Sequence, residues 1–218
     1  MKKIIFILFL CFFSSSPFCT PLGEEPDLYI NASGSVADPF NETLPTASRD
    51  LIYFMQSDPR WAEKNYGPQN CIAIYGCGPT VLSMLVSTFT EQVIQPDEMA
   101  QWCYQNGFFS PNSGSYHSVI PEGAKAWGLK SKVLTEPTYD AIRKELSNDR
   151  VIVLLMGKGH FTEGGHFLIV RNITLDGKLL LADPNSLGNS YTAWEPEFVL
   201  SQVKIGRETG CPVWSIGK

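Results

Sequence analysis

The residue with the clearest catalytic potential is Cys77, which stands between Gly76 and Gly78 directly before a predicted helix. A thiol at the N-terminus of a helix feels the positive end of the helix dipole, which favours the nucleophilic thiolate. The flanking glycines would let a substrate backbone approach closely. A structural cysteine or a disulfide accounts for this position equally well, so Cys77 alone does not predict an enzyme.

A histidine and an aspartate are placed to support such a nucleophile. His166 follows two glycines and begins the apolar strand predicted over residues 166–170, so its imidazole lies at the open end of a strand. Asp183 follows the strand predicted over residues 178–182, and the turn formers between the two strands predict a hairpin. His166 and Asp183 should therefore meet at one edge of the sheet, where the carboxylate can orient the imidazole.

Other polar residues compete for these two roles. Asn185 could replace Asp183 as the partner of the imidazole. The chain has two further histidines, His117 before a predicted helix and His160 in a glycine-rich loop, and neither begins a strand. His166 is therefore the preferred general base.

A nucleophilic thiol that attacks a carbonyl also needs donors for the negative charge that develops on the oxygen. The backbone N–H of Cys77 is one such donor, and the side-chain amide of a glutamine could be the second. Gln56 and Gln69 are the two candidates, of which Gln69 is nearer in sequence. A solvated glutamine is an equally good interpretation of either residue.

Hydrophobic periodicity predicts the elements that must position these residues. Helices are predicted over residues 77–90, 96–106, 118–127, 138–147 and 196–203. Strands are predicted over residues 51–55, 130–134, 151–156, 166–170 and 178–182. The continuous apolar run 151–156 is typical of a strand buried on both faces. Because helices come first and an antiparallel sheet follows, the fold class is α+β rather than an alternating parallel sheet.

Four motifs, taken together and in this order, resemble papain-like cysteine peptidases. The most similar branch is the bacterial group that resembles the double-glycine bacteriocin-leader peptidases, and the resemblance covers roughly residues 51–205. The motifs are Gln56-Ser57-Asp58-Pro59-Arg60-Trp61, Gly76-Cys77-Gly78-Pro79-Thr80, Gly159-His160-Phe161-Thr162 with Gly164-Gly165-His166-Phe167, and Asp183-Pro184-Asn185-Ser186.

This resemblance implies a papain-like fold in which a nucleophile helix packs on an antiparallel sheet, with a triad of Cys77, His166 and Asp183. It favours Gln56 as the oxyanion donor, because the surrounding Gln-x-Asp-x-x-Trp pattern matches that branch. Gln56 lies 21 positions before Cys77, whereas the leader peptidases place their glutamine much closer. The transporter domains of those peptidases are missing here, so the resemblance does not imply leader processing. It implies neither a metal nor an organic cofactor.

The N-terminus predicts export. Three residues with two lysines precede ten unbroken apolar residues, 4–13, and three serines follow, as in a secretory signal peptide over residues 1–20. Residues 21–50 are rich in turn formers and predict a flexible linker or pro-segment, with the peptidase domain over 51–218. The chain is therefore expected to be secreted or held at the surface of a bacterial cell. Lipid anchoring at Cys19 is a weaker alternative, because Pro17 and Phe18 precede it.

Four of the six cysteines would remain after removal of the signal peptide: Cys71, Cys77, Cys103 and Cys211. An even number permits two disulfides, whose pairing the sequence does not decide. None of the spacings fits a zinc site. The alternative to an enzyme is thus a catalytically inactive papain-like binding or adhesion module, in which Cys77 forms a disulfide.

Composition limits the partners. The 218 residues are 44% hydrophobic, which suffices for a large core, and carry 17 basic against 22 acidic side chains, a net charge of −5. The absence of a basic stripe argues against a nucleic-acid partner, and no apolar run is long enough for a membrane span. The chain is expected to be a monomer whose partner is a peptide or protein substrate, with the peptide stems of a cell wall among the options.

Overall fold

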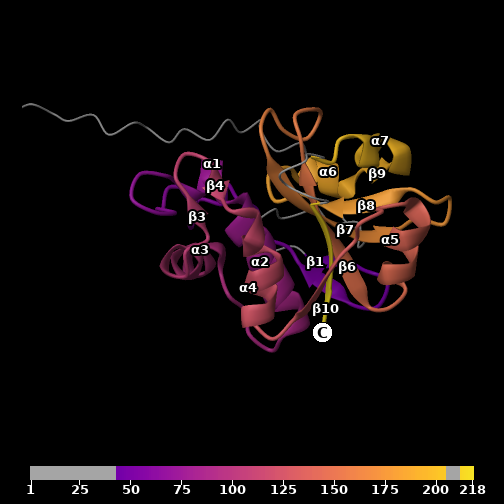
Figure 1. Cartoon of the computed structure of the whole chain (residues 1–218), viewed down its shortest axis with the longest axis horizontal. Helices are drawn as coiled ribbons and strands as arrows, with labels where there is room; N and C mark the ends of the chain where they lie inside the picture. The colour runs from indigo at the N-terminus through magenta and orange to yellow at the C-terminus, as the bar shows by residue number, and fades with distance from the viewer. Residues whose placement is uncertain (1–42, 205–211) are drawn as a thin grey trace, which may run out of the picture.

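The computed structural model, which describes residues 43–204 and 212–218, has a helical half and a half built on a large sheet. Figure 1 shows α1–α4 gathered on one side and the large sheet on the other, with α2 the member of the helical group that contacts β7 of the sheet. The predicted signal peptide, most of the predicted linker and Cys211 lie outside the described residues. Across the described residues, no helix combines the length and the apolar character that a bilayer crossing requires.

The helical half is built around α2 (Cys77–Phe89), which follows the short α1 (Ile72–Tyr75) after a single glycine. Pro79 is tolerated in the first turn of α2, because its missing N–H would have no intrahelical partner there. Most side chains of α2 are buried, so this helix is the core of its half. The remaining elements of this half are α3 (Pro96–Gln105), β3 (Phe109–Ser110), β4 (Gly114–Ser115), η1 (His117–Val119) and α4 (Pro121–Ala126).

The other half is a six-stranded antiparallel sheet with the order β5-β10-β6-β7-β8-β9. Its strands are β5 (Lys130–Val133), β6 (Arg150–Met156), β7 (His166–Ile173), β8 (Leu179–Ala182), β9 (Ala193–Trp194) and β10 (Val213–Gly217). The helices of this half are α5 (Tyr139–Leu146), α6 (Leu187–Tyr191) and α7 (Pro196–Ser201). The predicted hairpin between β7 and β8 is present, and Gly177 adopts φ +91° in its turn.

The two central strands, β6 and β7, are buried on both faces. Alternate side chains of β6 such as Val153 pack into the core shared with α2, while their neighbours such as Leu154 pack into a second core with α5 and α7. This arrangement confirms the interpretation of the continuous apolar run. It also fixes α2 against β7, which is the contact that brings the two halves of the candidate site together.

The observed elements differ from the predicted ones at several places, apart from the short elements that were not predicted. Residues 43–45, assigned from sequence to the linker, form β1 (Thr43–Pro45), which pairs with β2 (Asp50–Ile52) because Leu44 is buried and Arg171 donates to the Pro45 carbonyl. The strand predicted over 51–55 ends at Ile52. The helix predicted over 118–127 is divided at Pro121 into η1 and α4. The last predicted helix, 196–203, ends at Ser201.

Candidate active site

Cys77 lies at the first position of α2, where it is partly exposed. Its sulfur is hydrogen-bonded to the side chain of His166 and accepts from the backbone N–H groups of Phe167 and Gly78. A β-carbon added to Gly78 would lie 2.6 Å from Ser115 Oγ, so only glycine fits this close approach of α2 to β4. The start of the helix and the start of β7 therefore enclose the sulfur with donors.

His166 is the first residue of β7, and only 6% of it is exposed. Its Nε2 lies 2.6 Å from Oδ1 of Asp183. Because Nε2 faces the carboxylate, Nδ1 is the ring nitrogen that remains for the thiol. A single imidazole thus bridges the helical half and the sheet half.

Asp183 follows β8 and is 1% exposed, yet both oxygens of its carboxylate have hydrogen-bond partners. Oδ1 also accepts from the backbone N–H of Asn185 at 2.9 Å, and Oδ2 accepts from Nδ2 of Asn189 at 2.8 Å. Tyr53 holds the same turn from the other side, since its hydroxyl donates to the Asp183 carbonyl at 2.6 Å. The carboxylate is therefore fixed in one orientation toward His166.

The three side chains shift each other's ionisation. Burial alone would raise the pKa of the Cys77 thiol, but the hydrogen bond and charge of His166, with two backbone N–H groups, lower it below the usual value. Burial alone would lower the pKa of His166, but the charge and hydrogen bond of Asp183, followed by Cys77, raise it to about 10. His166 and the two asparagine donors keep the pKa of Asp183 low despite its burial. The arrangement favours a thiolate–imidazolium pair beside a carboxylate at neutral pH.

The two glutamines proposed as oxyanion donors have different surroundings. Gln56 is buried, and its backbone N–H donates to the Pro184 carbonyl at 2.7 Å, next to Asp183. Its side-chain Nε2 donates at 2.9 Å to two carbonyl oxygens of α1, those of Ile72 and Ala73. Gln56 thus ties the turn before Cys77 to the sheet half, and its donor role stays a prediction. Gln69 is exposed.

The state of the cysteines decides whether Cys77 is available as a nucleophile. Cys77 and Cys103 are free, and Cys103 is completely buried. Cys71 is disulfide-bonded. The alternative in which Cys77 is lost to a disulfide with Cys71 or Cys103 is therefore not favoured. Within residues 43–204 and 212–218, no group of histidines, cysteines and carboxylates could hold a metal ion.

The competing histidines pack on aromatic side chains. His160 packs on Trp194, with ring centroids 5.0 Å apart. His117 packs edge-on against Phe167, with ring centroids 6.3 Å apart. The contribution of Asn189 was missed from sequence, because nothing local connects it to Asp183. Asn185 contributes its backbone N–H rather than its side chain.

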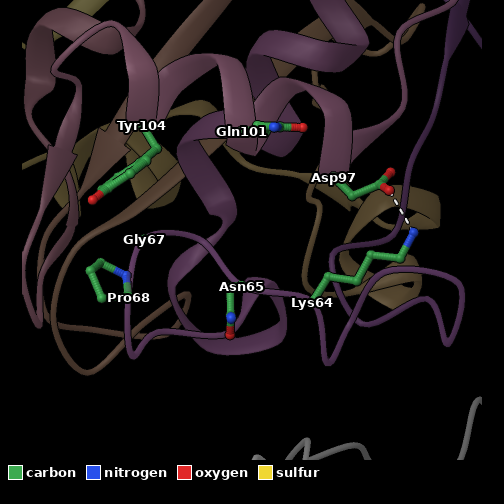
Figure 2. A pocket seen from close by; sticks show the side chains of 7 residues that line it. All are labelled: Lys64, Asn65, Gly67, Pro68, Asp97, Gln101 and Tyr104. Carbon is green, nitrogen blue, oxygen red and sulfur yellow. Dashed lines mark hydrogen bonds and ion pairs between the residues drawn. The ribbon is translucent and has the colours of Figure 1, made fainter.

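A hollow of about 360 Å³ lies elsewhere on the helical half (Figure 2). The loop 64–68 and three side chains of α3 line it, and Figure 2 shows the ion pair between Lys64 and Asp97 at its rim, with 2.6 Å between Nζ and Oδ2. None of Cys77, His166 and Asp183 contributes to its lining. The hollow is therefore separate from the candidate active site.

Comparisons with known proteins agree with this architecture. The Peptidase_C39 like family matches residues 49–204. A structure described as a C39-like peptidase from Bacillus anthracis is similar with a TM-score of 0.50 and 15% identity, covering 82% of this chain and 98% of that chain. The peptidase domain of Streptococcus ComA, a bifunctional ABC transporter involved in a quorum-sensing pathway, has a TM-score of 0.43 and 19% identity, covering 66% and 90%. No curated protein matches significantly. The family match and the Bacillus anthracis structure confirm the expected papain-like α+β fold.

Proposed function

Because this chain belongs to the Peptidase_C39 like family and is a papain-like cysteine peptidase, we propose that Cys77, His166 and Asp183 are its catalytic triad. The observation that carries the proposal is the position of His166, which is hydrogen-bonded to the Cys77 sulfur and to the Asp183 carboxylate at once. The lowered pKa of Cys77 and the raised pKa of His166 support the same assignment. A thiol with a lowered pKa next to an imidazole with a raised pKa is typical of an activated nucleophile.

In the proposed mechanism, the thiolate of Cys77 attacks the carbonyl carbon of a peptide bond and forms a carbon–sulfur bond. The backbone N–H of Cys77 lies in the first turn of α2, where it has no intrahelical partner, and donates to the oxyanion. The His166 imidazolium gives its proton to the leaving nitrogen as the carbon–nitrogen bond breaks, which releases an amine and leaves a thioester. His166 then takes a proton from water, the resulting hydroxide attacks the thioester, and the acid product and the thiolate are formed.

Gln56 is the proposed second donor to the oxyanion. Its amide lies between α1 and the turn after Asp183, and both of its described acceptors are backbone carbonyls. For this role, the Gln56 amide must give up its hydrogen bond to the carbonyl of Ile72 or Ala73 and donate to the substrate oxygen instead. Asp183 acts by holding His166 in the orientation and tautomer that the proton transfers need.

We propose that the substrates are exported or extracellular peptides, host proteins or the peptide stems of a cell wall, cleaved by a secreted or surface-held monomer. The support is the N-terminal pattern of lysines, apolar residues and serines. N-terminal sequencing of the exported protein tests this. A mature chain that begins between residues 15 and 21 is expected, and retention of Met1 would contradict it.

The triad is tested by comparing Cys77→Ala with Cys103→Ala, which removes the other free thiol of the described residues. Each protein is incubated with a proteome-derived peptide pool, and new termini are identified by mass spectrometry. Wild type and Cys103→Ala should cut the pool and react with an epoxide thiol inhibitor, whereas Cys77→Ala should do neither. Cleavage by Cys77→Ala would refute the proposal.

A further inference from the structure

The surface beside His166 is open on the side of the preceding glycines. A β-carbon added to Gly164 would meet nothing within 4 Å. One added to Gly165 would meet only Leu155 and the Nζ of Lys204, each at 3.8 Å. An ammonium therefore borders the space next to the catalytic imidazole.

The backbone of Lys204 fixes the position of this residue. Its N–H donates to the Leu155 carbonyl at 2.8 Å, which fixes the residue across from the start of β7. Within the described part of the chain, no carboxylate forms an ion pair with Lys204. The nearby Lys158 differs, because it is paired with Glu163 at 2.8 Å. Among the described residues Lys204 is therefore a cation without a carboxylate partner, close to the glycine that precedes His166.

His117 approaches the same place from the helical half. Its ring packs edge-on against Phe167, whose backbone N–H donates to the Cys77 sulfur. Burial and then the charge of Lys204 lower the pKa of His117, so its imidazole is neutral and able to donate a hydrogen bond at neutral pH. A cation from one half and a neutral donor from the other thus lie close to the residues that hold the reacting sulfur, near enough to each other for the charge of Lys204 to act on His117.

We propose that Lys204, together with His117, binds a substrate carboxylate close to the scissile bond, so that the enzyme prefers peptides with a negative charge there. This inference rests on the proposed peptidase function. The carboxylate could belong to an acidic side chain or to the C-terminus of the peptide, since an ammonium recognises both in the same way.

Alkylation of Cys77 provides a test that needs no known substrate. The rates of modification by anionic iodoacetate and by neutral iodoacetamide are measured at pH 7 on the Cys77 peptide by mass spectrometry. The ratio of the two rates should fall roughly twofold to fivefold in Lys204→Gln, the range expected for one exposed charge pair, and further in Lys204→Glu. Lys204→Arg should keep the wild-type ratio, and so should the control Lys158→Gln, which makes the same charge change on a paired lysine. The iodoacetamide rate itself reports whether each variant has kept its fold.

The outcomes separate the two hypotheses. Slow modification of wild-type Cys77 by both reagents, at the rate of a free thiol, would refute the peptidase proposal and this inference with it. If Cys77 is modified rapidly and the ratio of the iodoacetate rate to the iodoacetamide rate is the same in wild type, Lys204→Gln and Lys204→Glu, the carboxylate site is refuted and the peptidase proposal stands.

Paired synthetic peptides then identify the source of the carboxylate. Each pair differs only by Glu against Gln at one position, or by a free against an amidated C-terminus, and cut sites are read by mass spectrometry. Faster cleavage of the Glu peptides supports an acidic side chain, and faster cleavage of the free C-termini supports a terminal carboxylate. Either preference should disappear in Lys204→Glu. Equal cleavage within all pairs by an active wild type would overturn the inference.

Discussion

The Asp183→Asn substitution isolates the charge of the carboxylate from its shape. Asp183 is 1% exposed, and an asparagine of nearly equal volume would leave the packing intact. The asparagine oxygen can still accept from His166 and from the backbone N–H of Asn185. Its amide nitrogen would face the Asn189 donor, but Asn189 can turn its own amide to offer an oxygen. The main loss is therefore the negative charge.

The size of the effect follows from the pKa of His166. The charge and hydrogen bond of Asp183 overcome the effect of burial and raise that pKa from 6.5 to about 10. Without the charge the pKa should fall toward or below its ordinary value of 6.5, because burial, the largest influence on it, lowers it. The imidazolium form exists below the pKa and is lost as pH rises through it. With 6.5 as the upper bound, the protonated fraction at pH 8 would drop from nearly all molecules to about 3% or less, which is a loss of the active ion pair of roughly 30-fold or more, and at pH 7 the loss would be about fourfold or more.

The assay is the pH dependence of kcat/KM on a cleaved peptide and of Cys77 alkylation by iodoacetamide, between pH 5 and about 11. The wild type should lose activity on the alkaline side near pH 10, and Asp183→Asn should lose it at least two units lower. Asp140→Asn, at an exposed position of α5, makes the same chemical change and should keep the wild-type profile. An alkaline limb that stays near pH 10 in Asp183→Asn would refute the electrostatic role assigned to the carboxylate.

Three further substitutions test the supports of the site and of the fold. Asn189→Leu removes the donor to Oδ2 of Asp183 and should lower kcat about tenfold with little change in KM, measured by steady-state kinetics, because a hydrogen bond to a buried charge is lost. Glu145→Ala removes the buried carboxylate that pairs with both Lys132 and Arg150, and it should reduce the free energy of unfolding at pH 7 by about 3 kcal/mol. The control Glu122→Ala, at an exposed position, should change that free energy by less than about 0.5 kcal/mol. Because the pKa of Glu145 is lowered in the folded state, its contribution is complete above about pH 4.5 and shrinks as pH falls through the folded pKa, which urea titrations at several pH values would show. Leu85→Ala, at a fully buried position of α2, should cost about 2–5 kcal/mol in the same urea titrations, and a cost below 1 kcal/mol would contradict the packing of that helix.

The elements with strong local patterns could be predicted from sequence. The helix that begins at Cys77 is marked by a first-turn proline and by apolar residues at helical spacing, and α2 ends within one residue of the predicted position. The strands β6, β7 and β8 are continuous apolar runs separated by turn formers. β10 was not predicted, although it lies between β5 and β6, because its pairing partners at Lys130 and Arg150 are more than sixty residues away and its own apolar run is short. Nothing in a local window reports such a pairing.

The same distinction between local and distant contacts governs the candidate site. His166 and Asp183 flank one hairpin, so their proximity follows from the turn and the direction of two adjacent strands, and the structure places them 2.6 Å apart. The approach of Cys77 to His166 depends instead on the packing of α2 against β7, which only the family resemblance predicted. The cation of Lys204 and the imidazole of His117 could not be predicted by either route, because they come from different halves and belong to no motif. A motif specifies the reacting atoms, whereas the charges around them depend on how the two halves meet, so selectivity should vary more readily than mechanism among chains with this fold.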